Sequence, residues 1–285
     1  MFNFNGKLIN EEDKILDAKN RGLQFGDGVY EELRVVSGEV IFLEEHYLRL
    51  MSSMRILRME IPMNFTMEFM EEEMLKTISN EDLKQTKHIK FTVFRKNEND
   101  NALANNSISY IVTTSILPNH FYVLEENEYE VELFKDFYKN ASMLSNLDTT
   151  NKILNVVGKI YAQENDYHDC LVLNEQKQVI ESLNGNIFLI QKNIIKTPPL
   201  TDGCLNGILR KKLIEIISKL EDYELQELSI SPFELQKADE LFVINAIEGI
   251  ISITKYRKKL YSNYVAKNLI GKLNAAARMS VSKAV

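Results

Sequence analysis

Segments with the spacing of strands and segments with the spacing of helices alternate along the 285 residues of this chain. Val29–Val36 is rich in β-branched and apolar residues, and Ser37–Gly38 predicts a hairpin turn at its end. Glu44–Leu57 instead repeats its apolar residues at the spacing of a helix. Sequential strands joined by turns, with helices between them, predict an α+β protein with mixed sheets.

The strand and helix patterns stop between Ser115 and Tyr122, in a stretch that contains Pro118. A chain of 285 residues is long enough for two domains. We therefore predict a small N-terminal domain of residues 1–116 and a larger C-terminal domain of residues 117–285.

The balance of charges argues against several classes of partner. The chain has 34 Lys and Arg residues against 41 Asp and Glu residues, a net charge of −7, so neither nucleic acid nor a membrane surface is expected to bind. Two cysteines and four scattered histidines provide no disulfide framework and no metal-ligand spacing. We see no signal peptide and no membrane-spanning run, and therefore expect a cytoplasmic protein.

Three short segments contain residues with useful chemistry. Gly203 and Gly207 precede a helical segment, and a helix N-terminus can bind a phosphate group. Glu181 ends a predicted strand just before a small polar turn. Lys152 lies at the start of a predicted helix, where its charge opposes the helix dipole. Each also has an ordinary explanation: a plain loop-to-helix junction, a surface hairpin and a solvated lysine.

The order of these segments is more specific than any one of them. Together with others they read Gly26–Glu31, His46–Leu50, Lys152–Asn155, Glu181–Phe188, Thr197–Pro198, Gly207–Arg210 and Ala238–Phe242. This string, from about Phe2 to Thr254, resembles the class IV aminotransferase family, also called fold type IV pyridoxal 5'-phosphate (PLP) enzymes. The family includes branched-chain aminotransferases, D-amino acid aminotransferases and 4-amino-4-deoxychorismate lyases. The resemblance implies a two-domain fold like that of D-amino acid aminotransferase.

The resemblance also implies roles for individual residues around PLP. The family's Schiff-base lysine, which also moves the α-proton of the substrate, falls on Lys152. Its acidic partner of the pyridine nitrogen falls on Glu181, and its phosphate-binding arginine falls on Arg49. The remaining cofactor-binding residues implied are Asn186, the helix start Gly207, Ile208 and Leu209, and the loop residues Asn245 and Ala246.

One face of the strand Val29–Val36 is implied to contact the substrate. Tyr30, Glu32 and Arg34 share this face because side chains alternate along a strand. Glu32 is unusual, because relatives have small or apolar residues there. A carboxylate would repel an anionic substrate unless Arg34 neutralises it. The resemblance further implies a homodimer and a small amino-acid-like substrate.

The reaction is less well defined by the sequence than the cofactor. Val156 replaces a tyrosine of branched-chain enzymes, Leu209 replaces a common threonine, and Asn245–Ala246 replaces a hydroxyl-bearing loop. These differences favour a 4-amino-4-deoxychorismate lyase, which eliminates pyruvate and leaves 4-aminobenzoate. Against it, Asn97–Asn106 contains no cation to hold a substrate carboxylate. The alternative is an amino-acid transaminase of the branched-chain or D-amino acid type that uses 2-oxoglutarate.

Overall fold

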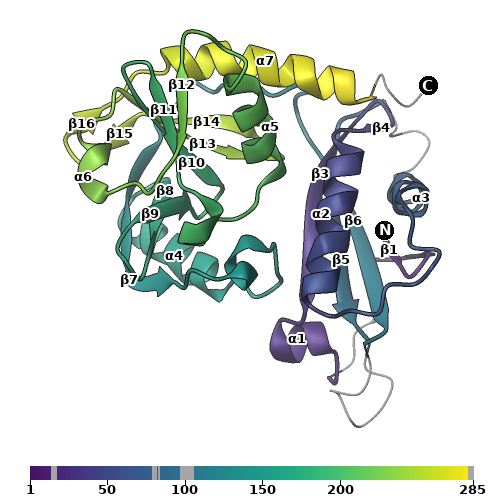
Figure 1. The fold of residues 1–285 in the computed structure, drawn as a ribbon. Coiled ribbons are helices and arrows are strands. Elements are labelled where there is room, and N and C mark those ends of the chain that lie inside the picture. Colours follow the sequence, from purple (N-terminus) through teal and green to yellow (C-terminus); the bar gives the residue numbers. More distant parts are fainter. Residues whose placement is uncertain (14–17, 79–81, 83, 97–105, 282–285) are drawn as a thin grey trace. The chain divides into compact units, whose positions relative to one another are not determined.

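The computed structural model describes residues 1–13, 18–78, 82, 84–96 and 106–281. Contacts group the chain into two compact units, each with its own sheet or sheets and core (Figure 1). Unit 1 contains Met1–His120, Asp148–Asn151 and Ala277–Val285, and unit 2 contains Phe121–Leu147 and Lys152–Ala276. The division into domains of residues 1–116 and 117–285 stays a prediction.

Unit 1 is built on a six-stranded antiparallel sheet with the order β2-β1-β6-β5-β3-β4. Its strands are β1 (Phe2–Phe4), β2 (Lys7–Ile9), β3 (Gly28–Val36), β4 (Glu39–Val40), β5 (Lys87–Arg95) and β6 (Ile108–Ile116). Its helices are α1 (Arg21–Phe25), α2 (Leu43–Ile56) and α3 (Met67–Thr77). The strand predicted at Val29–Val36 and the helix predicted at Glu44–Leu57 are β3 and α2, each within one residue at either end.

The core of unit 1 lies between one face of this sheet and the two longer helices. Leu33 and Val35 of β3 pack there with Leu50 and Met54 of α2 and with Met70 of α3. Since side chains alternate along a strand, Tyr30, Glu32 and Arg34 lie on the opposite face of β3. Apolar burial by α2 and α3 therefore orients the face on which the substrate contacts are predicted.

Unit 2 contains two five-stranded mixed sheets, with the orders β12-β11-β10-β13-β14 and β16-β15-β7-β8-β9. Parallel pairs join β7 to β8 and to β15, and β11 to β12, while the other pairs are antiparallel. The strands are β7 (Glu130–Lys139), β8 (Asp169–Asn174), β9 (Val179–Ser182), β10 (Asn186–Gln191), β11 (Ile194–Thr197), β12 (Glu224–Glu227), β13 (Glu240–Asn245), β14 (Gly249–Ile253), β15 (Lys255–Tyr256) and β16 (Lys259–Leu260). The predicted α+β fold with mixed sheets is confirmed.

Helices and short 3₁₀ turns surround the sheets of unit 2. They are η2 (Met143–Asn146), α4 (Ile153–Glu164), η3 (Leu200–Asp202), α5 (Ile208–Ile217), α6 (Pro232–Leu235) and α7 (Tyr264–Val281), the last five residues of which belong to unit 1. One core cluster includes Leu133, Leu171 and Leu241 from both sheets. A second, which includes Phe134, Ala162 and Val172, packs α4 onto the sheet that contains β7 and β8. Among the described residues no helix has the length and apolar character needed to cross a membrane.

Two glycines of unit 2 form a matched pair for a test of this packing. A Cβ at Gly185 would lie 2.3 Å from the carbonyl oxygen of Ile244, whereas one at Gly271 on α7 would meet nothing within 4 Å. Gly185→Ala should lower the free energy of unfolding by about 1–3 kcal/mol, because a backbone atom must move. Gly271→Ala should raise it by up to about 1 kcal/mol, because alanine favours helix. Chemical denaturation followed by circular dichroism checks both variants. Equal unfolding midpoints for the two variants would contradict the close approach of Gly185 to Ile244.

Candidate cofactor and substrate site

Lys152 occupies the N-cap position of α4 in unit 2. Its carbonyl oxygen accepts the hydrogen bond of Val156 N–H at 2.9 Å, so its backbone starts the helix while its side chain makes no capping bond. The first turn of α4 contains no acidic residue. The ammonium group of Lys152 therefore receives no compensating charge from the start of its own helix, whose dipole opposes it.

The helix α4 is attached to the turn that follows Glu181. Asn155 Nδ2 donates to the carbonyl oxygen of Leu183 at 2.9 Å. One turn along, a Cβ at Gly158 would lie 2.6 Å from Leu183 Cδ2, so only glycine allows this close approach. These contacts bring the helix that begins at Lys152 and the turn after Glu181 together.

Glu181 is a buried carboxylate on β9 with both oxygens engaged. Oε1 lies 2.7 Å from Lys139 Nζ, and Oε2 accepts the N–H of Leu205 at 2.7 Å. A buried charge needs a partner of opposite charge and hydrogen bonds, and this carboxylate has both. Lys139 was not among the predicted site residues. It reaches Glu181 from the end of β7, after a register shift between β7 and β8.

The loop before α5 presents the N-terminus of that helix. Gly207 is the N-cap, and a Cβ there would lie 2.2 Å from Asn186 Oδ1, so the close approach requires glycine. Asn186 Nδ2 also donates to Leu205 O at 2.8 Å and so braces the loop. No acidic residue occupies the first turn, which includes Ile208 and Leu209. Their N–H groups and the positive end of the dipole suit an anion such as phosphate.

Asn245 is the last residue of β13 and Ala246 follows it, at the end of the sheet where β10 begins. Asn186 pairs with Ile244 in the β10–β13 register, so the loop from Asn245 starts next to Asn186. Asn245 Oδ1 accepts the N–H groups of Ile247 and Glu248, at 3.0 and 2.8 Å. The side chain of Asn245 is thus used within its own turn.

Arg49 lies in unit 1 and forms part of a buried charged cluster. Its Nε and Nη2 donate to the two oxygens of Glu31 at 2.8 and 2.5 Å, and His46 Nδ1 lies 2.7 Å from Glu31 Oε2. Asp148 Oδ2 lies 3.9 Å from Arg49 Nη2. Burial by itself would lower the pKa of Arg49, but the charge and hydrogen bonds of Glu31 and the charge of Asp148 raise it above its ordinary value. Arg49 therefore stays cationic, as a phosphate ligand must.

The residues just before Lys152 pair with β3 in unit 1. Tyr30 N–H donates to Asp148 O at 2.9 Å, and Thr150 N–H donates to Gly28 O at 2.9 Å. Burial, and next the charge of Asp148, raise the pKa of the Tyr30 phenol far above its ordinary value. Tyr30 therefore keeps its proton at any working pH and can act as a hydrogen-bond donor.

Glu32 lies close to two residues of β5, of which Lys90 is the cation. His88 Nε2 and Lys90 Nζ lie 3.4 and 3.9 Å from Glu32 Oε1. Burial by itself would raise the pKa of Glu32, but the nearby His88 and the charge of Lys90 lower it. The antiparallel register places Lys90 directly opposite Glu32. Arg34 is buried, and its Nη2 donates to Asn119 O at 2.6 Å.

Lys90 gives this face of β3 a positive charge that the sequence alone did not reveal. Its ammonium lies 3.9 Å from the centre of the Tyr30 ring, a cation–π distance. Tyr30, Glu32 and Lys90 thus form one contact group in unit 1. Residues 97–105 lie outside the described part of the chain, so the cation-poor segment Asn97–Asn106 stays a sequence observation except for Asn106.

The chain is similar to known proteins over most of its length. The family description Amino-transferase class IV matches residues 28–256. A provisionally named branched-chain-amino-acid aminotransferase of Methanocaldococcus jannaschii is 26% identical over 273 residues, which are 94% of this chain and 92% of that protein. The D-alanine aminotransferase of Bacillus licheniformis is 26% identical over 254 residues, 88% of this chain and 86% of that one.

Solved structures show the same fold. The branched-chain aminotransferase of Thermoproteus uzoniensis superposes with a TM-score of 0.85 at 22% identity and covers 99% of this chain and 95% of its own. A provisionally named 4-amino-4-deoxychorismate lyase of Legionella pneumophila gives a TM-score of 0.79 at 21% identity, with coverage of 93% and 97%. With a family match over residues 28–256, this chain belongs to the class IV aminotransferase family of PLP-dependent enzymes.

Proposed function

We propose that this chain is an amino-acid transaminase of the branched-chain or D-amino acid type, with 2-oxoglutarate or a similar keto acid as amino acceptor. Relatives with transaminase names match 94% and 88% of the chain, which favours this alternative over the lyase that the sequence suggested first. The observation that carries PLP-dependent chemistry is the buried Glu181 carboxylate, held between Lys139 and the N–H of Leu205.

The donor groups of unit 2 fit PLP. The cofactor requires an amine for attachment, an anion for its pyridine nitrogen and a site for its phosphate. We assign these to Lys152, to Glu181 and to the N–H groups of Ile208 and Leu209 after Gly207. Asn245 and Ala246 are assigned to a further phosphate contact. Asn186 completes the assigned set by holding the loop before α5 through Leu205.

When bound, PLP supplies an electron sink that makes the α-hydrogen of an amino acid acidic. Lys152 is assigned to carry that proton at Nζ. A lysine can do so only as a neutral amine, and Lys152 stands at the start of α4, where a helix dipole opposes a positive charge. Lys139 compensates the charge of Glu181, so Glu181 can remain an anion at the cofactor nitrogen.

The charged residues of unit 1 are assigned to the cofactor phosphate and the substrate. Arg49 is the phosphate ligand, and its bidentate contact with Glu31 fixes the plane of the guanidinium. Tyr30, Glu32 and Arg34 are the substrate-facing residues, with Lys90 as the cation that Glu32 balances. A homodimer is also part of the proposal. It is supported by three exposed apolar residues on one face of α4, Ile153, Val156 and Ile160.

The second candidate function is 4-amino-4-deoxychorismate lyase. It is favoured by the absence of hydroxyl groups at Leu209 and at Asn245–Ala246, where transaminases commonly have them. Both reactions begin with removal of the α-proton, which is the role assigned to Lys152. They differ in whether the substrate fragments or passes on its amino group, so a product assay separates them.

The proposed reaction predicts which product forms. Purified protein with added PLP should produce glutamate from 2-oxoglutarate and a branched-chain amino acid or D-alanine. It should release little pyruvate from aminodeoxychorismate. Lys152→Ala should abolish glutamate formation and the visible absorbance of bound cofactor, because the attachment point is lost. Glutamate and pyruvate are measured by coupled assays. Release of pyruvate from aminodeoxychorismate without any glutamate formation would overturn the transaminase in favour of the lyase.

The balance between Glu32 and Lys90 predicts opposite effects of two substitutions. Glu32→Gln leaves the charge of Lys90 uncompensated, so KM for 2-oxoglutarate should fall by about two- to fivefold, the usual scale of a partly exposed ion pair. Lys90→Met should raise the same KM. Steady-state kinetics with 2-oxoglutarate and with a keto acid whose side chain is uncharged check this. A change of the same sign in both variants would show that the pair acts on folding and not on the substrate.

A further inference from the structure

Unit 2 contains a cavity of about 530 Å³ outside the candidate cofactor residues. Its lining residues come from β7, β8, the β8–β9 turn, α6 and the β15–β16 turn. Cavities of this size hold small organic molecules. None of its lining residues is a cofactor or substrate residue named above, so the cavity has no part in the proposed reaction.

An irregularity in the sheet opens this cavity. Phe134 of β7 pairs with Val172 of β8, and the next paired residues are Lys139 and Asn174. Residues 135–138 of β7 therefore stand opposite Leu173 alone, and the strands separate there. Lys135, Tyr138 and Leu173 line the space that results. The same bulge ends at Lys139, the partner of Glu181, so an occupant of the cavity would lie beside that segment.

The cavity has an apolar floor and an aromatic rim. Leu133, Leu173 and Tyr256 are almost fully buried and belong to the core of unit 2. At the rim, Tyr138 and Phe233 are 44% and 79% exposed, unusual for aromatic side chains. This arrangement suits a flat apolar molecule that packs against the buried floor residues and the exposed aromatic rings of the rim.

The charged lining residues are all cations. Lys135, Lys177 and Arg257 line the cavity, and no Asp or Glu does, although the chain has a net charge of −7. Arg257 is paired with Glu132 at 3.1 Å. Within the ranges that the structure describes, no acidic side chain pairs with Lys135 or Lys177. The charge of the rim therefore complements an anion.

Acidic residues close in sequence are engaged elsewhere. Glu175, which precedes Lys177 in the β8–β9 turn, accepts the N–H of Ala141 at 3.2 and 3.0 Å. Glu234 of α6 is bound to Lys196 and to the N–H of Ser231, each through one oxygen. These carboxylates are bound to Ala141, Lys196 and Ser231, and the cationic character of the rim is preserved.

From this combination we infer that the cavity binds a small organic anion with a flat apolar body, such as an aromatic carboxylate or sulfonate. The apolar floor and the rings of Tyr138 and Phe233 bind the body. Lys135 and Lys177 bind the anionic group. The cavity is a second site of this chain, distinct from the assigned cofactor residues.

A fluorescent probe of this chemistry tests the inference. Anilinonaphthalene sulfonate added to the PLP-loaded enzyme should bind saturably at one site per chain, and a saturating amino acid substrate should not displace it. Its neutral analogue phenylnaphthylamine should bind at least about tenfold more weakly, because it lacks the charge that the lysines attract. Equal affinity for the two probes would overturn the assignment of an anion.

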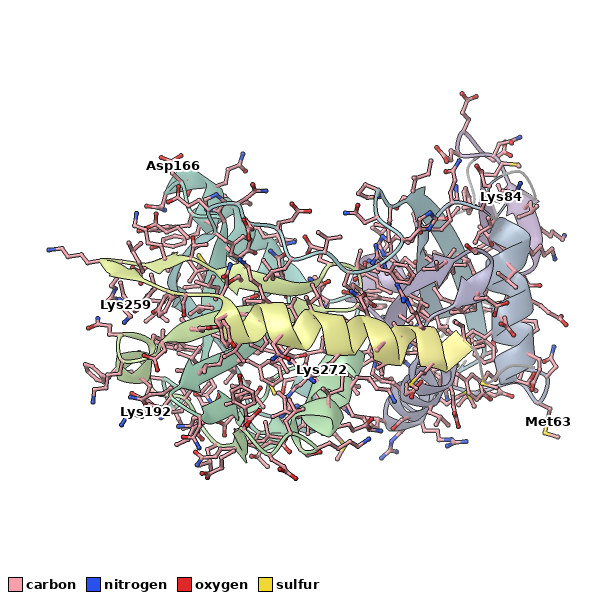
Figure 2. The ribbon with its side chains drawn as sticks, turned by 90° about the horizontal axis from the view of Figure 1, so that it is seen from above. Met63, Lys84, Asp166, Lys192, Lys259 and Lys272 are labelled. Carbon is pink, nitrogen blue, oxygen red and sulfur yellow. The ribbon has the colours of Figure 1, made fainter. Side chains whose placement is uncertain are left out.

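Two charge-reversal variants locate the site. Lys135→Glu combined with Lys177→Glu should weaken the sulfonate by at least about tenfold. Lys192→Glu combined with Lys272→Glu makes the same change of charge on exposed residues outside the cavity, both labelled in Figure 2, and should leave binding unchanged. Unchanged cofactor absorbance in both variants shows that each is folded. Equal weakening by the two variants, or binding without saturation, would contradict the site.

Discussion

The pairing of Glu181 with Lys139 and the N–H of Leu205 is the interaction on which the candidate cofactor site depends. A carboxylate with low exposure is stable as an anion only if its neighbours supply charge and hydrogen bonds. Lys139 supplies the charge from the bulged end of β7, and Leu205 supplies the hydrogen bond from the loop before α5. The same loop carries Gly207 into contact with Asn186 and so presents the N-terminus of α5. The carboxylate of Glu181 thus connects β9 with the end of β7 and with the loop that leads into α5.

The sequence predicted well what depends on local pattern. Alternation along β3 and helical spacing along α2 gave both elements within one residue, and the same alternation separates Tyr30, Glu32 and Arg34 from the core. The motif order gave the family, because the glycines and the charged residues occur together in a fixed sequence. These properties are encoded within a few residues of one another.

Contacts that depend on strand register were not predictable in the same way. Lys139 meets Glu181 only because β7 shifts its register against β8, and Lys90 meets Glu32 because β5 pairs with β3 in one of many possible registers. The ion pair of Glu31 could have been partly predicted. Glu31 is a charged residue at a core-facing position of a strand, so it needs a buried partner, which here is Arg49.

The proposed role of Glu181 at the pyridine nitrogen of PLP depends on its pairing with Lys139, and cofactor affinity tests this dependence most directly. PLP is titrated into the apo forms of the wild type, Lys139→Met and the control Lys192→Met, with visible absorbance as the readout. PLP should bind at least about tenfold more weakly to Lys139→Met, because a buried carboxylate loses its charged partner, and equally well to the control. Wild-type affinity in Lys139→Met would show that the cofactor does not depend on this pairing.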